Sequence, residues 1–313
     1  MQMACAVLFC LLTFCYLYCY QADILVVTQF MASGGQTHYA PLLGAVLITA
    51  TLQILQATVQ FFAKLQRRTY ALTYAPSLLV LTILTDISPH VRQHIDFGLW
   101  WLTGPLALIV ILLALIPAHR YQPYEPEERK TGITSQLLWI NLGTLCLMFL
   151  FVNLLSNSDR YFHQRAHMEH LIDQRRYREA LSVAERMERT DSVTSMMTIY
   201  ASARCSQLTD SLFHYKLVGG SGVMRPSPQV HAMLMPDSIL NQVTRQSANY
   251  QLTGFLLDRD LQTFCAYLPL YYKTNEPMPR YYAEAWQLHH DLQAGIRPKG
   301  YRKGSYTYYY MNR

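Results

Sequence analysis

Three histidines on one predicted helical face are the first residues whose spacing could support chemistry. His163, His167 and His170 follow each other at i, i+4 and i+7, so a helix would bring them to the same side, with Glu169 beside them. Imidazole nitrogens are common zinc ligands, and three of them could share one ion. The alternative is a solvated, partly aromatic helical face. The spacing therefore makes these three histidines a candidate metal site.

A second group of polar and ionisable residues lies near the ends of apolar segments. It comprises Asp23, His38, Tyr39, Asp86, His94 and Asp96, with His90 one helical turn before His94. Ionisable groups at a membrane are costly, so they are candidates for a functional site. The alternative is that they are loop residues facing water. We expect this cluster to lie on the outer face of the membrane.

Familiar catalytic motifs are absent from the sequence. It contains no phosphate-binding G-x-x-x-x-G-K-[ST], no G-x-S-x-G, no H-E-x-x-H and no C-x-x-C. We therefore expect no cofactor, and a non-enzymatic role more than a familiar enzymatic one. Nucleic acid is not an expected partner, because the basic residues are mixed with acidic ones at helical spacing and no run of five or six like charges appears.

The elements that must position these residues are mostly apolar in the first half of the chain. Hydrophobic residues make up 51% and charged residues 15% of the sequence, against about 25% charged in a typical soluble protein. The charges concentrate in the second half. This predicts a transmembrane domain over residues 1–157 and an extramembrane domain over residues 158–313.

Five apolar stretches are predicted to span the membrane, because roughly 20 apolar residues in a helix cross the hydrocarbon core. They are residues 3–20, 41–62, 70–85, 97–116 and 136–155. The first is expected to be retained, since it lacks the basic start and small cleavage residues of a signal peptide. The third is short and contains Pro76, so a kinked, tilted or re-entrant segment is the alternative to a straight span. Ala22–Ala32 is expected to lie at the interface.

One polar stripe runs along the second predicted span. Thr49, Gln53, Gln56 and Gln60 fall on the same helical face. Buried amides in membrane helices bond to neighbouring helices, so the stripe is interpreted as packing. A polar permeation path is the alternative.

Basic residues in the short loops predict the orientation, because cytoplasmic loops gather Lys and Arg. The loop between spans one and two has none, and the loop between spans three and four has only Arg92. The loops after spans two and four contain Lys64, Arg67, Arg68, Arg120, Arg129 and Lys130. This places the N-terminus in the cytoplasm and the second half outside it. Several arginines after span five argue the other way, but they belong to a folded domain, where the rule weakens.

The second half is predicted to be helical. Helices are expected within residues 160–189, 192–206, 209–216, 237–258, 261–272 and 280–294. Tyr177, Ala180 and Ala184 have the spacing of a tetratricopeptide-like (TPR-like) hairpin, in which small alanines let two helices approach. The alternative is an irregular helical domain. Helical solenoids usually bind proteins or peptides on a concave face.

Two further features of this half leave alternatives open. Residues 301–310 hold five tyrosines and neighbouring basic residues. This tail is expected to cap the helical stack, with contact to a membrane interface as the alternative. Cys205 and Cys265 are candidates for a disulfide if the domain is extracytoplasmic.

Several short segments resemble an uncharacterised bacterial family of multi-pass membrane proteins with a TPR-like C-terminal region. They are SGGQTHY at 33–39, ALTYAPS at 71–77, LTD at 84–86, FG at 97–98, LTDSLF at 208–213, MPRYYAEA at 278–285 and YTYYY at 306–310. The resemblance implies topology and repeats rather than chemistry. The C-terminal tails of the family that the chain resembles favour Trp after the first tyrosine, where this chain has Thr307.

The sequence therefore predicts an all-α protein: a bundle of about five transmembrane helices followed by a degenerate TPR-like domain. The first functional hypothesis is a non-enzymatic scaffold, anchored in a bacterial inner membrane, whose helical domain binds a protein or peptide outside the cytoplasm. The second is a membrane enzyme or transport component that uses the outer-face His/Asp cluster. The lipid bilayer is a partner in both, and the sequence predicts no oligomeric state.

Overall fold

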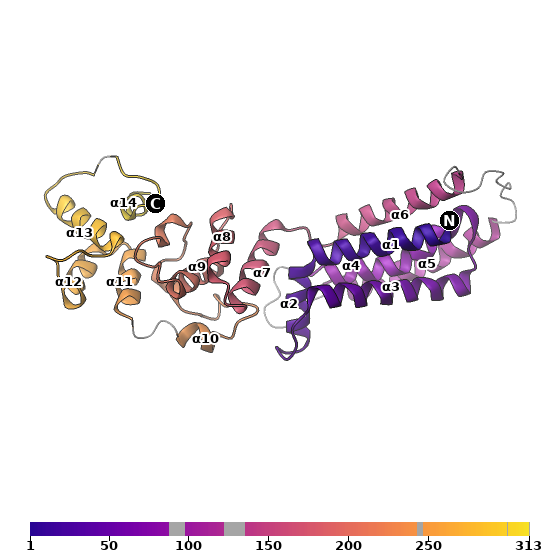
Figure 1. Cartoon of the computed structure of the whole chain (residues 1–313), viewed down its shortest axis with the longest axis horizontal. Helices are drawn as coiled ribbons and strands as arrows, with labels where there is room; N and C mark the ends of the chain where they lie inside the picture. The colour runs from indigo at the N-terminus through magenta and orange to yellow at the C-terminus, as the bar shows by residue number, and fades with distance from the viewer. Residues whose placement is uncertain (88–97, 122–134, 243–246, 299, 313) are drawn as a thin grey trace. The chain divides into compact units, whose positions relative to one another are not determined.

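The structure is a computed structural model of the whole chain, and it describes residues 1–87, 98–121, 135–242, 247–298 and 300–312. In this described part, 72% of the residues are helical and no strand occurs. The chain forms two compact units, Met1–His163 and Gln164–Arg313 (Figure 1). The predicted boundary lay at residue 157. The all-helical prediction is confirmed for the described residues.

The first unit is a helical bundle. Its helices are α1 (Gln2–Cys15), continued by the π-helical turn η1 (Tyr16–Tyr20), α2 (Ala22–Ala32), α3 (Pro41–Ala63), the 3-10 helix η2 (Arg67–Tyr74), α4 (Ala75–Thr85), α5 (Trp100–Tyr121) and α6 (Gln136–Leu155).

Four segments of this unit are long and apolar enough to cross a membrane: Gln2–Tyr20, Pro41–Ala63, Trp100–Arg120 and Gln136–Leu155. They turn large apolar side chains outward; Phe62 is 76% and Trp101 75% exposed. Such a surface is costly in water and suits lipid. The predicted first, second, fourth and fifth spans are therefore confirmed as membrane-capable helices.

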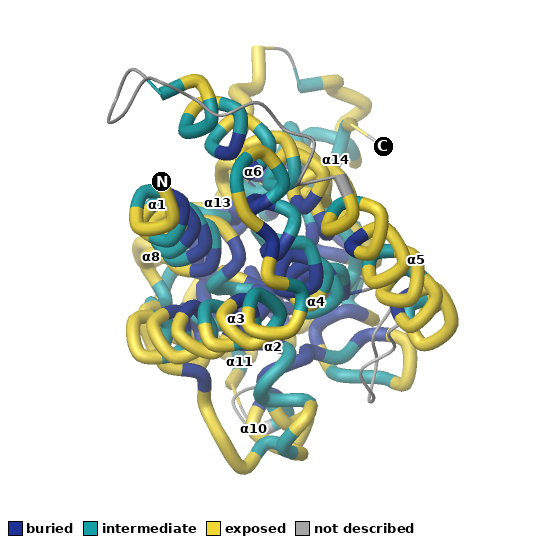
Figure 2. The backbone as a smooth tube through the Cα atoms, turned by 90° about the vertical axis from the view of Figure 1, so that its right-hand side faces the viewer, coloured by how far each residue is buried: buried dark blue, intermediate teal, exposed yellow. Residues whose placement is uncertain are grey.

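The predicted third span differs from the other four. Its α-helical part, α4 (Ala75–Thr85), has only 11 residues with Pro76 in the first turn, while the preceding residues form η2. Proline is compatible with the first turn of a helix, so Pro76 helps to start α4 and does not kink it. Six residues of α4 are buried: Pro76, Ser77, Leu78, Leu81, Thr82 and Thr85. Viewed end-on in Figure 2, α4 lies in the interior of the bundle.

Together, η2 and α4 nevertheless run the length of α6. Near the start of α6, the Ala71 N–H donates to Asn141 Oδ1 at 2.8 Å. Just beyond the end of α6, the Asn157 N–H donates to the Thr85 carbonyl at 3.2 Å. The chain therefore passes along the bundle five times, through α1, α3, η2–α4, α5 and α6.

Amide side chains join the interior helices of the bundle. Gln56 Nε2 donates to Thr73 Oγ1 at 2.9 Å, and Gln53 Nε2 donates to Gln56 Oε1 at 2.9 Å. Gln60 Nε2 donates to the Leu65 carbonyl at 2.8 Å, and Thr49 is buried. These contacts agree with the packing interpretation of the stripe.

The second unit is built from short helices. They are α7 (Arg160–Asp173, which begins in the last residues of the first unit), α8 (Tyr177–Arg186), α9 (Ser192–Arg204), the 3-10 helices η5 (Leu212–His214) and η6 (Gly220–Met224), α10 (Asp237–Gln242), α11 (Ala248–Leu257), α12 (Leu261–Tyr271), α13 (Arg280–Gln293) and α14 (Tyr306–Met311). One apolar cluster joins α7, α8 and α9, and a second joins α11, α12, α13 and α14.

Three of these helices end in the same way. After α7, α9 and α11, the residues Arg175, Ser206 and Arg259 take positive φ angles of 61°, 57° and 62°. In each case this residue and its successor donate N–H bonds back to carbonyls of the last helical turn. This is the Schellman arrangement, which turns the chain sharply after a helix. In α7–α8 and α11–α12 the turn leads directly into the next helix.

Two of the predicted helices are wrong in extent. The predicted helix over residues 237–258 is two helices, α10 and α11, and residues 243–246 between them are outside the described part. Residues 209–216 contain only η5. There Asp210 accepts the backbone N–H of Arg280 at 3.1 Å, so this segment is held by a distant helix.

Candidate functional site

A groove of about 550 Å³ lies between η6 and the helices α11 and α12. Its size is within the range of ligand-binding pockets. It is lined by Ser221, Gly222, Met224, Arg225, Tyr250, Gln251, Gly254, Phe255, Asp258 and Tyr267.

Hydrogen bonds with Tyr250 of α11 and with Asp258, the residue directly after α11, hold η6 in place, and η6 forms one side of the groove. Asp258 accepts two hydrogen bonds from Ser221, one from its N–H at 2.7 Å and one from its hydroxyl at 2.5 Å. The Tyr250 hydroxyl donates to the Met224 carbonyl. Just before this point the chain turns through Gly219 at φ 93°, a conformation that glycine adopts without strain.

The other side of the groove is aromatic. The rings of Phe255 and Tyr267 lie 5.4 Å apart, and Tyr267 is 44% exposed. The exposed apolar surface continues along α12 with Leu270, which is 72% exposed, and with Tyr271, whose hydroxyl donates to Gln251 Oε1 at 3.2 Å. Arg225, also in the groove lining, is exposed. The groove thus combines aromatic surface with one cation and hydrogen-bonding groups.

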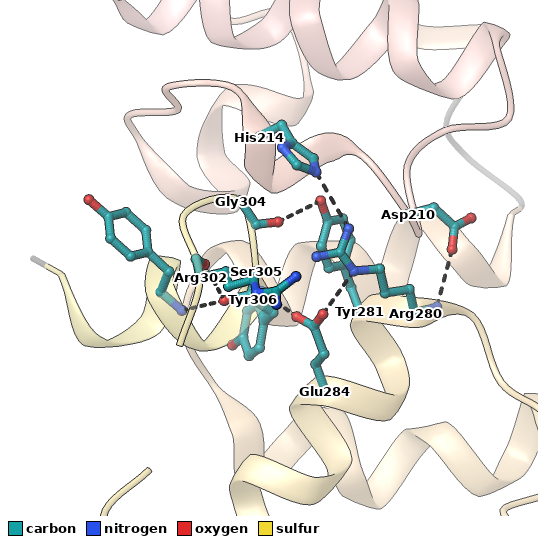
Figure 3. Close-up of polar contacts among 10 residues, drawn as sticks. Asp210, His214, Arg280, Tyr281, Glu284, Arg302, Gly304, Ser305 and Tyr306 are labelled. Atoms are coloured by element: carbon teal, nitrogen blue, oxygen red, sulfur yellow. Dashed lines mark hydrogen bonds and ion pairs between the residues drawn. The ribbon is translucent and has the colours of Figure 1, made fainter. Parts of the chain in front are cut away.

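A second polar cluster joins the tail to α13 (Figure 3). Glu284 accepts the Tyr306 N–H at 2.6 Å and the Arg280 Nε–H at 2.9 Å. The Tyr281 hydroxyl donates to the Gly304 carbonyl at 3.2 Å. Burial raises the pKa of the Tyr281 and Tyr306 hydroxyls above the usual range, so both remain neutral. This cluster is suited to fixing the tail.

The packing of the tail favours the capping interpretation. Tyr306 is fully buried, and the Tyr309 hydroxyl donates to the Leu257 carbonyl at 2.9 Å. Phe213, far earlier in the chain, has its ring 5.1 Å from that of Tyr306 and 4.8 Å from that of Tyr281. The segments 208–213, 278–285 and 306–310 therefore meet in one place.

The three histidines of the candidate metal site have separate contacts. A ring nitrogen of His163 lies 3.2 Å from the Asn157 carbonyl oxygen, and His170 Nε2 lies 2.8 Å from Gln174 Nε2. His167 interacts electrostatically with Glu179, whose pKa is lowered chiefly by the hydrogen bond from Arg176. Within the described residues, no three His, Cys, Asp or Glu side chains are grouped closely enough to hold a metal ion.

Glu169, between these histidines, has a structural position that the sequence did not indicate. Its carboxylate is fully buried and accepts the N–H groups of Met233 and Leu234 at 2.6 and 3.0 Å. Arg165 Nε donates to it at 3.2 Å. Burial raises the pKa of Glu169, while Arg165 and the two backbone donors oppose this effect. Glu169 therefore attaches the loop at 233–234 to α7.

The outer-face cluster is only partly described. His90, His94 and Asp96 lie outside the described residues. Asp86 accepts the Trp100 indole N–H at 2.5 Å, and the His38 ring lies 5.8 Å from that of Phe30. Tyr39 is buried with its ring against Gly44, and Asp23 lies in the first turn of α2. The described members thus have different local environments.

The two candidate disulfide cysteines are free thiols in the structure. Cys205 packs against the cluster around α7–α9, whereas Cys265 packs against the cluster around α11–α14. Burial raises the pKa of Cys265 to about 11, which keeps that thiol protonated and unreactive at neutral pH. The structure therefore does not join Cys205 and Cys265 in a disulfide.

A further polar cluster closes one end of the bundle, and the sequence did not indicate it. The Tyr16 hydroxyl donates to Ser156 Oγ at 2.5 Å and accepts from Gln21 Nε2 at 2.9 Å. Asn157 Nδ2 donates to the Ile87 carbonyl at 2.7 Å. The signal in the sequence was weak, because Tyr16 lies inside an apolar stretch and Gln21, Ser156 and Asn157 simply follow one.

Comparisons of the chain with protein-family models, with curated proteins and with solved structures gave no match.

Proposed function

We propose that this chain is a multi-pass protein of a bacterial inner membrane that acts as a non-enzymatic scaffold, and that its helical unit binds a peptide segment of a partner protein outside the cytoplasm. The observation that carries the proposal is the groove between η6, α11 and α12, with its exposed aromatic side.

The charge distribution in the bundle supports this orientation. Asn141 Nδ2 lies 3.3 Å from Met1 Sδ and donates to the Arg67 carbonyl at 2.7 Å, so Met1 and the basic segment at 64–68 share one end of the bundle. Lys and Arg near membrane spans favour the cytoplasmic side. Five passes of the chain then bring residue 157 to the other side, and the helical unit follows from there.

The composition of the groove favours a peptide. Protein-binding surfaces are enriched in aromatic residues and Arg, and a few such residues usually supply most of the affinity. An apolar side chain of the peptide would pack against the paired rings of Phe255 and Tyr267. A carboxylate would pair with Arg225, and Gln251 would hydrogen-bond the peptide backbone. The expected ligand is thus an extended segment with an apolar anchor next to an acidic residue.

The helical pairs support a TPR-like arrangement. In α7–α8 and in α11–α12, an arginine in the left-handed conformation joins two packed helices. Stacked helical pairs commonly present a peptide-binding surface. This support is an analogy at the level of the fold.

Site-specific photocrosslinking in cells tests the binding surface. A photoreactive phenylalanine in place of Tyr267 is expected to give an adduct of discrete mass, and Arg225→Glu should weaken it strongly. The matched control places the same group at Arg178, an exposed position on α8. Equal adducts at both positions, or an adduct at 267 that is insensitive to Arg225→Glu, would contradict the proposal.

A reporter fused to the C-terminus tests the orientation independently. A reporter that is active only outside the cytoplasm is expected. Activity restricted to the cytoplasm would show that the helical unit lies on the other side.

A further inference from the structure

A second groove, of about 610 Å³, lies in the membrane unit between the C-terminal ends of α3 and α5. Its walls are apolar and include Val59, Leu112 and Ile116, whereas Lys64, His119 and Arg120 line one end. Apolar and cationic side chains are thus separated along the length of the groove.

The two helices bring these cations together because they run in the same direction. Both α3 and α5 end at the basic end of the bundle, which also carries Arg67 and Arg68. Lys64 closes α3 in the left-handed conformation at φ 50°, and its N–H donates to the Gln60 carbonyl at 2.8 Å. Lys64 and Arg120 are exposed, and neither forms an ion pair with a described carboxylate.

The walls of the groove belong to the lipid-facing surface. Leu112 and Ile116 are 47% and 51% exposed, and both lie in a helix that is long and apolar enough to span a membrane. A water-soluble anion would match the cations but not these walls. A neutral lipid would match the walls but leave the cations without a counter-charge. An anionic amphiphile matches both parts of the groove.

We propose that this groove binds an anionic phospholipid. Lys64 and Arg120, assisted by His119, bind the phosphate, and one acyl chain lies along Val59, Leu112 and Ile116. Basic pockets between membrane helices on the cytoplasmic side are suited to such headgroups. The inference goes beyond the proposed scaffold function and does not depend on the peptide-binding groove.

The test measures lipid retention by the full chain. The purified protein is reconstituted with phosphatidylcholine and a minor fraction of phosphatidylglycerol, returned to mild detergent, and examined by native mass spectrometry. The wild type is expected to retain phosphatidylglycerol in preference to phosphatidylcholine. The double variant Lys64→Gln/Arg120→Gln should lower that retention by about tenfold or more.

Two matched controls separate a site from general surface charge. Arg68→Gln removes a charge from the same basic region outside the groove and should leave retention close to that of the wild type. Ala63→Trp fills the groove without changing charge and should abolish retention, whereas Ala57→Trp, exposed elsewhere on α3, should not. The proposal is overturned if Arg68→Gln acts as strongly as the double variant, or if Ala63→Trp retains the lipid.

Discussion

Arg175 and Arg259 occupy equivalent positions in two helical hairpins of the second unit. Both residues have a left-handed backbone conformation. The residue after each donates its N–H to a carbonyl five residues earlier: Arg176 to Leu171 at 2.8 Å and Asp260 to Phe255 at 2.9 Å. Their side chains differ. Arg259 Nη2 donates to the carbonyls of Tyr309 and Asn312, at 3.0 and 2.8 Å, whereas Arg175 is exposed.

Glycine substitutions should therefore act in opposite directions at these two positions. Arg175→Gly relieves the strain of a left-handed backbone conformation at a residue that carries a side chain. It should stabilise the unit by about 0.5 kcal/mol, after the greater freedom of glycine in the unfolded chain is counted. Arg259→Gly should destabilise it by about 1–2 kcal/mol, because two hydrogen bonds to the tail are lost. Hydrogen exchange of peptides from α8 and α12 in the full chain measures both effects. Changes of the same sign would refute the difference in roles.

Glu169 should be among the most sensitive residues of the second unit. Glu169→Gln removes the buried carboxylate partner of Arg165, which keeps only Asp191 at 3.5 Å, and weakens the attachment of Met233 and Leu234, so a loss of about 3 kcal/mol is expected. Glu185→Gln, at an exposed position on α8, is the matched control and should change stability by less than about 0.5 kcal/mol. Thermal unfolding of the full chain in detergent compares the two variants. Equal effects would mean that burial of the carboxylate is unimportant.

Asp260 should make the stability of α12 depend on pH. Its side chain accepts the Thr263 N–H at 3.0 Å, and hydrogen bonds from Thr263 hold its pKa below the usual value of 3.8. Because the folded pKa is the lower one, the stabilisation is complete above pH 3.8 and is lost as the pH falls through the folded pKa. Asp260→Ala should cost about 1 kcal/mol at neutral pH.

The control for this prediction is Asp260→Asn, which keeps a cap acceptor but does not titrate. It should retain most of the stability at neutral pH and remove the acid-dependent part. Hydrogen exchange of α12 peptides, corrected for intrinsic rates at neutral and acidic pH, provides the measurement. If Asp260→Asn showed the same acid dependence as the wild type, another group would be responsible.

Asn141 should stabilise the bundle through η2. Asn141→Leu removes the acceptor of the Ala71 N–H and the donor to the Arg67 carbonyl, so about 1–2 kcal/mol should be lost. Asn153→Leu, on the same helix but exposed, should be neutral or slightly stabilising in lipid. Thermal aggregation of the full chain in detergent distinguishes them. A larger loss for Asn153→Leu would argue against this role of Asn141.

Local sequence information was sufficient for the long helices and insufficient for the segment at 70–85. The run of apolar residues predicted a membrane-spanning helix over residues 136–155, and these are the bounds of α6. The prediction was possible because length and hydrophobicity decide whether a helix can span a membrane. The 3-10 conformation of η2 could not be predicted in this way. It depends on Asn141, an acceptor 70 residues away in the sequence.

The candidate sites show the same division. Periodicity correctly placed the three histidines in one helix, but it gave no information about the burial of each side chain or about its hydrogen-bond partners. Glu169 is buried by a loop that lies 64 residues later in the sequence. The groove was missed for a similar reason. Phe255 and Tyr267 have ordinary core spacing, and one side of the groove is formed by η6, which Asp258 holds through Ser221, 37 residues earlier in the chain.

The contacts of Phe213 also constrain the order of events during translation. Its ring partners Tyr281, Tyr306 and Tyr309 are all made later. At about 5–20 residues per second, the ribosome needs on the order of ten seconds to supply them. Throughout that interval the nascent chain exposes an incomplete apolar surface, which makes the segment around Phe213 a candidate for chaperone binding before the unit closes.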